Sequence, residues 1–213
     1  MARPTLGNVT EPVATPDLNK TSKSWTHNNN GNMLVVTLHF RDSGVAATNV
    51  AVTFGGVNVP VVAFEYTNIN VGQVWMGILK NAASGSDTVA ASWTGTMDRC
   101  AYSSRSYIGA TNYGTPVQAS GDSSTATVNI STLQATDGLV IDAFTNEWDG
   151  TITVGANQTK EYGYAVSNLT WGGSRESSNG GTVTMSWTEG GGEWGIIAIE
   201  IYPVTFIPQI IMS

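Results

Sequence analysis

Two copies of one short pattern constrain the fold of this chain more than any other feature of its sequence. Residues 88–94 and 182–188 both read T-V-x-x-S-W-T. Each copy follows a glycine-containing turn and precedes another glycine and a strand-like run, so the neighbours match in the same order. We therefore expect two equivalent strands in two halves of one β-sandwich, with each half unable to cover its own apolar face.

Further matched segments define the extent of the two halves. Residues 34–40 alternate apolar and polar positions, as a half-buried strand does, and residues 139–145 resemble them. Val50 to Val61 form a hairpin pattern around Gly55-Gly56. About twelve strands in a single β-sandwich or jelly roll account for this spacing. We expect one domain over residues 25–203, with halves at about 33–109 and 138–203.

The composition supports an all-β protein. Only 12% of the 213 residues are charged, 24 are glycine, and no segment has the apolar spacing of an amphipathic helix. The one cysteine, Cys100, excludes an intrachain disulfide and is expected to be a small buried strand residue.

Both ends of the chain fall outside the repeat. Residues 1–24 contain Pro4, Pro12 and Pro16 and predict an extended N-terminal arm, with a disordered leader as the alternative. Residues 204–213 are too apolar to stay exposed, so they form either an extra strand or a tail that docks on a neighbouring chain. Prolines 203 and 208 favour docking. The docking residues are expected to be Phe206, Ile207, Ile210, Ile211 and Met212.

Charge limits the classes of partner. The net charge is −7 and there is no cluster of lysine or arginine, which argues against direct nucleic-acid binding. The N-terminus has no apolar signal segment and the sequence has no membrane span, so we expect synthesis in a host cytoplasm and no membrane partner.

The acidic stretch Asn146 to Gly150 is the strongest candidate for chemistry. Glu147 and Asp149 are two residues apart, so on a strand they would face one side, as a glycosidase pair or a Ca²⁺ site. A solvated turn is the favoured interpretation. Asp142 lies within an apolar strand and is expected to face outward, with a buried carboxylate as the alternative.

Other catalytic and metal patterns are missing. His27 and His39 lack the spacing of zinc ligands, and there is no nucleophile elbow, phosphate-binding loop or dinucleotide fingerprint. We expect no cofactor, no metal and no enzymatic activity.

The tryptophans divide into core and surface candidates. Trp93 and Trp187 occupy equivalent strands and are expected in the core. Trp148 and Trp171 lie near turns among polar residues, so they are the candidates for stacking on a sugar.

The order of motifs resembles a group of Gly/Ser/Thr-rich, jelly-roll-like β-sandwich modules of tailed-phage virion proteins and exported bacterial proteins. The resemblance covers roughly residues 25–203 and rests on the segments L-V-V-T-L-H-F, V-T-F-G-G, V-W-M-G, S-x-x-T-V-x-x-S-W and I-I-A-I-E-I. It implies a fold and a virion or surface setting, without catalytic residues.

We therefore expect a non-enzymatic virion structural protein. It would be a phage capsid decoration or minor head or tail component, a homo-oligomer located in the virion and docked on other capsid or tail subunits. The alternative is a carbohydrate-binding module that recognises surface glycans through Trp148 and Trp171.

Overall fold

The computed structural model describes residues 2–11, 16–41, 44, 46–67, 72–131, 133–166 and 168–203, and these residues form strands and no helix. The predicted all-β class is confirmed. No helix in the described residues is long and apolar enough to span a membrane. The strands are β1 (Thr5–Thr10), β2 (Asp17–Asn29), β3 (Met33–Arg41), β4 (Thr48–Phe54), β5 (Val57–Asn58), β6 (Val61–Tyr66), β7 (Gly72–Lys80), β8 (Gly85–Ile108), β9 (Asn112–Tyr113), β10 (Val117–Gly121), β11 (Thr125–Ile130), β12 (Leu139–Asn146), β13 (Thr153–Val154), β14 (Thr159–Val166), β15 (Leu169–Ser177), β16 (Val183–Thr188) and β17 (Trp194–Tyr202).

The long strand β8 joins two layers of the N-terminal half. Its first part pairs with β2 and β4, and its second part pairs with β1 and β3. Pairing with β4 ends at Thr94 and pairing with β3 begins at Arg99, with Gly95 between them at a φ of 99°. A glycine adopts that backbone conformation without steric cost. One antiparallel sheet therefore folds over on itself into a sandwich.

The C-terminal half repeats this topology, apart from the two-residue strands β5 and β9, which have no counterpart. Taken in chain order, the eight strands from β10 to β17 correspond one to one to β1, β2, β3, β4, β6, β7, the first part of β8 and the second part of β8. The inner sheets have the order β1-β8-β3-β7-β6 and β10-β17-β12-β15-β14, and the outer sheets the order β2-β8-β4 and β11-β16-β13. Each half is thus an eight-stranded jelly roll. We call them the first (β1 to β8) and second (β10 to β17) jelly roll.

This arrangement corrects the predicted boundaries. Each half begins two strands earlier than expected, because β1 and β2 match β10 and β11. The predicted N-terminal arm is wrong for residues 5–10 and 17–24, which pair with β8 inside the first sheet. The twin T-V-x-x-S-W-T stretches do occupy equivalent places, in β8 and β16, on the outer layers.

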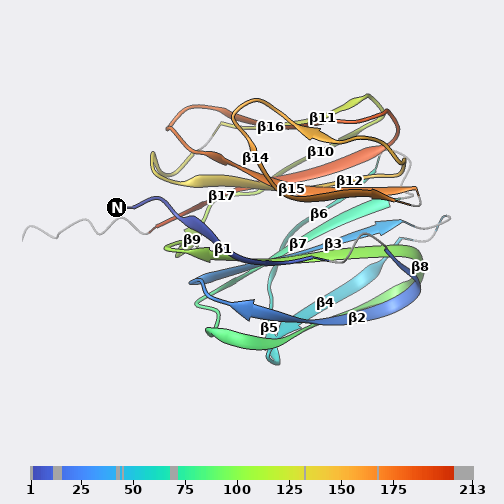
Figure 1. The fold of residues 1–213 in the computed structure, drawn as a ribbon, viewed down its shortest axis with the longest axis horizontal. Coiled ribbons are helices and arrows are strands. Elements are labelled where there is room, and N and C mark those ends of the chain that lie inside the picture. Colours follow the sequence, from blue (N-terminus) through green and yellow to red (C-terminus); the bar gives the residue numbers. More distant parts are fainter. Residues whose placement is uncertain are drawn as a thin grey trace, which may run out of the picture.

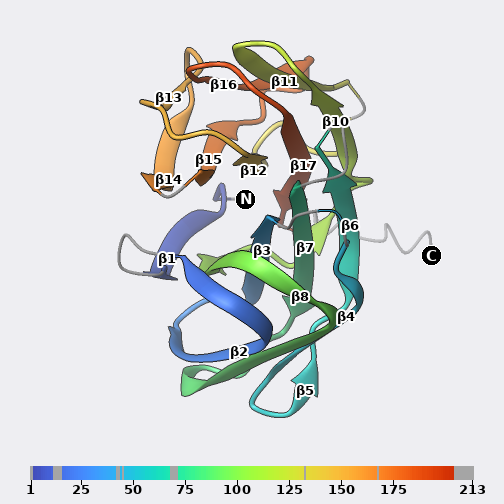
Figure 2. The same ribbon diagram turned by 90° about the vertical axis from the view of Figure 1, so that its right-hand side faces the viewer.

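The two jelly rolls stack into four layers, with β2 and β4 at one side and β11 and β16 at the other (Figures 1 and 2). Three apolar clusters fill the spaces between the layers, and Phe40, Ile199 and Trp187 are examples from the first, middle and last cluster. Each half thus covers one face of its inner sheet with its own outer layer. The other faces of the two inner sheets cover each other.

Burial of the inner layers on both faces explains their sequences. Strands β12 and β17 are buried at almost every position, which is why they contain long apolar runs. Strand β3 is also buried from Met33 to Phe40, but two of its buried residues, Thr37 and His39, are polar. Strands β11 and β16 in an outer layer alternate buried and exposed residues instead.

Candidate functional site: the Trp148 cleft

Trp148 lies in the loop that follows β12, and this loop is anchored on both sides. The Trp148 amide donates a hydrogen bond to Asn146 Oδ1 at 2.6 Å, and the Thr170 hydroxyl donates to the Trp148 carbonyl. The Asn168 amide donates to Asp149 Oδ1 at 2.7 Å. These bonds fix the backbone of the loop while the indole remains 63% exposed. An exposed aromatic side chain on a fixed backbone is suited to binding a ligand.

A glycine turn forms the wall beside the indole. Gly191 and Gly192 have φ angles of 102° and 112°, and a Cβ atom at Gly192 would lie 2.0 Å from Trp148 Cδ1. A larger residue at position 192 would therefore displace the indole as well as strain the backbone.

The indole opens onto a cleft of about 670 Å³. Its walls come from both jelly rolls, since Arg41 ends β3 and the other residues belong to the second half. The lining residues are Arg41, Asp122, Glu147, Trp148, Asn168, Gly190, Gly191, Gly192 and Glu193.

The cleft carries more negative than positive charge. Three carboxylates, Asp122, Glu147 and Glu193, face one guanidinium, Arg41. Glu147 is buried and accepts a hydrogen bond from the Thr67 hydroxyl. Burial raises the pKa of Glu147, and the nearby Glu193 raises it further, while the Thr67 bond and Arg41 oppose the rise.

This set of groups suits a hydroxyl-rich ligand. An indole face contacts the C–H surface of a pyranose ring, and carboxylates, an amide and a guanidinium satisfy its hydroxyl groups. The excess of carboxylates further favours a ligand with a positive charge.

The two residues of the predicted acidic pair lie in different environments. Glu147 and Asp149 lie beyond the last residue of β12, where side chains no longer alternate as in a strand. Glu147 is buried against Thr67, whereas Asp149 is exposed and binds the Asn168 backbone. In the described residues, no group of three or more histidine, cysteine or acidic side chains is placed to hold a metal ion.

Trp171 is not a ligand platform, and its prediction as one is wrong. It is fully buried on β15, on the same face of the strand as Leu169, and its ring lies 5.5 Å from that of Tyr164. Its polar neighbours are Thr170, on the opposite face of the strand, and Asn168, in the turn before β15, which is why Trp171 resembled a surface position.

The sequence did not indicate Arg41, Asp122 or Glu193 as partners of Trp148. They come from distant segments, and only folding brings them together. The predicted docking residues Phe206, Ile207, Ile210, Ile211 and Met212 lie outside the described residues.

The remaining titratable candidates are structural. His27 and His39 are buried, and burial lowers their pKa values to about 4 and about 3. His39 Nδ1 lies 2.8 Å from Thr145 Oγ1 in the second jelly roll. Cys100 is fully buried, as predicted. Asp142 faces inward and not toward solvent, which corrects its predicted orientation.

Asp142 gives the protein a specific pH dependence. Burial raises its pKa from 3.8 to about 6, against hydrogen bonds from Trp187 and Ser174 that lower it. The folded state therefore binds the proton of the Asp142 carboxyl more tightly than the unfolded state does. The stability that this protonated carboxyl contributes is present below about pH 4 and is lost as the pH rises through 6. From pH 4 to 7 the wild type should lose about 2 kcal/mol of unfolding free energy that Asp142→Asn does not lose.

Urea denaturation at pH 4, 5, 6 and 7 measures this difference. Parallel pH profiles of the wild type and Asp142→Asn would show that Asp142 is not the group responsible.

Comparisons with known proteins do not assign the cleft. No protein-family model and no curated protein sequence matches the chain. Among solved structures, the chain is similar to the CUB1-EGF-CUB2 domain of human MASP-1/3, with 8% identity, a TM-score of 0.25 and coverage of 91% of this chain and 98% of that chain. It is also similar to a chain of Red Clover Necrotic Mosaic Virus, with 10% identity, a TM-score of 0.26 and coverage of 97% and 100%. At these TM-scores the likenesses identify no family, and the architecture rests on the strand pairing described above.

Proposed function

We propose that this protein is a non-enzymatic structural component of a virus particle, a capsid decoration or a minor head or tail protein. The observation that carries the proposal is the pair of jelly rolls packed through a shared apolar core. Jelly rolls recur in viral capsid proteins, and two of them fixed face to face make a rigid body suited to a lattice. The resemblance of the sequence to β-sandwich modules of tailed-phage virion proteins supports the same setting.

Immunogold labelling of gradient-purified particles, from cells that make the protein, tests this role. We expect the protein in the particle fraction at a fixed ratio to the main capsid protein. Deletion of residues 204–213 should lower that ratio, since this segment is the proposed docking element. Recovery of the wild type only in the soluble fraction would contradict the virion role.

The Trp148 cleft favours a second function that is compatible with the first. We propose that it binds surface glycans, with the indole stacked on a sugar ring and the polar side chains bound to its hydroxyls. The three carboxylates favour a saccharide that carries an amino group over an acidic one.

The variant Trp148→Ala should lose glycan binding by at least about tenfold, because the stacking surface is removed. A glycan array identifies the ligand, and titration calorimetry then compares the wild type with Trp148→Ala. Leu18→Ala, which truncates an exposed apolar residue on β2, is the matched control and should bind as the wild type does. Absence of binding to every glycan, or equal binding by Trp148→Ala, would remove this function.

A further inference from the structure

A groove with a mostly apolar lining runs along both sides of β6, the last strand on the path of its sheet. One hollow, of about 280 Å³, lies between β6 and β4, and a second, of about 490 Å³, faces Gln118 of the second jelly roll. Val61, Phe64 and Tyr66 line both hollows. We call the two hollows together the β6 groove.

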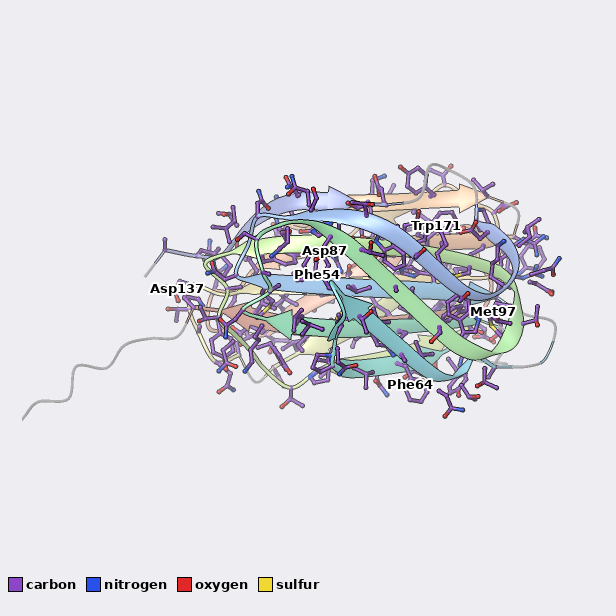
Figure 3. The ribbon with its side chains drawn as sticks, turned by 90° about the horizontal axis from the view of Figure 1, so that it is seen from below. Phe54, Phe64, Asp87, Met97, Asp137 and Trp171 are labelled. Atoms are coloured by element: carbon purple, nitrogen blue, oxygen red, sulfur yellow. The ribbon has the colours of Figure 1, made fainter. Side chains whose placement is uncertain are left out.

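The β6 groove exposes more apolar surface than the fold requires. Val61 and Phe64 are 55% and 49% exposed, and Phe64 stands at the outer edge of the molecule (Figure 3). Among the residues that the structure describes, none that lines the first hollow is charged, and Glu65 is the one charged residue that lines the second. Apolar patches of this kind on a soluble protein usually mark contact surfaces.

The chain itself contains a segment of matching chemistry. Residues 204–213 have no charged side chain and include Val204, Phe206, Ile207, Ile210, Ile211 and Met212. Ten extended residues reach about 33 Å, and a strand of six residues such as β6 is about 20 Å long. The segment is therefore long enough to cover the whole groove.

We propose that the β6 groove binds the C-terminal segment 204–213 of a second copy of this chain. The segment begins after Tyr202, which pairs with Asn112 of β9. The ring of the neighbouring Tyr113 lies 5.4 Å from Lys80 Nζ, so the segment leaves the fold near the last residue of β7. The opposite end of β7 pairs with Tyr66. A segment that docks on its own chain would have to reverse direction after β17 before it could run along β6. A segment from a second copy enters without this reversal.

Such a contact joins different surfaces of two copies, the segment of one and the groove of the next. Heterologous contacts of this kind repeat from copy to copy and produce rings or extended arrays. The inference rests on the proposed structural function for its biological meaning and names the partner of its docking segment. Its test uses the purified protein alone, so that it can fail independently of particle incorporation.

Analytical ultracentrifugation of purified variants tests the proposal. The wild type should self-associate with rising concentration. Deletion of residues 204–213 and Phe64→Lys should each give monomers, because one lacks the segment and the other has a charge in the groove. An equimolar mixture of these two variants should form a heterodimer, since one supplies an intact groove and the other an intact segment. Leu18→Lys, at an exposed apolar position outside the groove, should associate as the wild type does.

A fluorescein-labelled peptide of residues 204–213 provides the second measurement. It should bind the deletion variant, and Phe64→Lys or Val61→Lys in that background should weaken binding by at least about tenfold. Circular dichroism melting identifies any variant that fails to fold, and the other one then decides the test.

Three results would overturn the proposal. A monomeric wild type, with a peptide that binds only the deletion variant, would show that the segment occupies its own groove. Binding unaffected by both lysine variants, or no binding at all, would show that the groove is not the site. A monomeric wild type that still enters particles at a fixed ratio would refute this inference and leave the proposed function intact.

Discussion

Replacement of Glu161 by alanine should lower the free energy of unfolding by about 3–5 kcal/mol, because it leaves a buried guanidinium without its counter-ion. Arg105 and Glu161 have no exposed side-chain surface, and Arg105 Nη1 donates to Glu161 Oε2 at 2.6 Å. The Tyr107 hydroxyl donates to the same oxygen at 2.7 Å, and Arg175 Nη1 lies 3.1 Å from Glu161 Oε1. All these donors would lose their acceptor together.

The Glu161 substitution should destabilise the contact between the two jelly rolls, because the hydrogen-bond network spans it. Arg105 and Tyr107 belong to β8 of the first jelly roll, while Glu161 and Arg175 belong to β14 and β15 of the second. Arg105 also donates to the Asp142 carbonyl at 3.1 Å. The network therefore fixes the lateral position of one jelly roll on the other, which apolar contacts alone specify less strictly.

Urea denaturation followed by tryptophan fluorescence measures the loss. Asp17→Asn is the control, because the Lys23–Asp17 pair has a similar distance of 2.6 Å but is about one quarter exposed. Removal of this exposed pair should change stability by less than about 1 kcal/mol. Equal effects of the two substitutions would contradict the central role of Glu161.

The outer layers were predictable from sequence because water contacts one of their faces. In β16, Val183, Met185 and Trp187 are buried in turn with more exposed neighbours, and this alternation made the T-V-x-x-S-W-T pattern recognisable as a strand. The equivalence of the two copies followed from the same alternation.

The stacking of two jelly rolls was not predictable, because the hidden face of β3 is partly polar. Thr37 and His39 resemble solvent-facing residues in sequence, yet both are fully buried. Their partners are Tyr162, whose hydroxyl lies 2.9 Å from Thr37 Oγ1, and Thr145. A buried polar face that is satisfied by a distant segment has the sequence pattern of an exposed face.

The N-terminal strands were missed for a related reason. Strand β2 reads D-L-N-K-T-S-K-S-W-T-H-N-N, and most of its residues up to Ser24 are exposed. Its place in the sheet comes from backbone pairing with β8, which side-chain periodicity does not report. The exposure of Trp148 was predictable from the polar turn around it. The presence of Arg41 and Glu193 in the same cleft was not, because only the fold brings these distant residues to Trp148.

Replacement of Trp187 by alanine should cost about 3–5 kcal/mol of unfolding free energy. The indole is fully buried, lies 5.4 Å from the Phe144 ring at an interplanar angle of 10°, and packs on Gly172, where a Cβ atom would lie 2.6 Å from Trp187 Cη2. Alanine would leave a cavity between two layers that strand pairing holds apart, so the space cannot close. It would also remove the donor to Asp142 Oδ2, a bond of 2.8 Å.

Trp148→Ala is the matched control, since it removes the same indole from a position that is 63% exposed. Its cost should stay within about 1 kcal/mol. Trp187→Phe separates the two contributions, because it keeps an aromatic ring beside Phe144 but cannot donate to Asp142. It should therefore recover part of the loss, and its deficit should be larger at pH 7, where Asp142 is ionised, than at pH 4. A deficit of Trp187→Phe that is the same at both pH values would show that packing alone accounts for the tryptophan at this position.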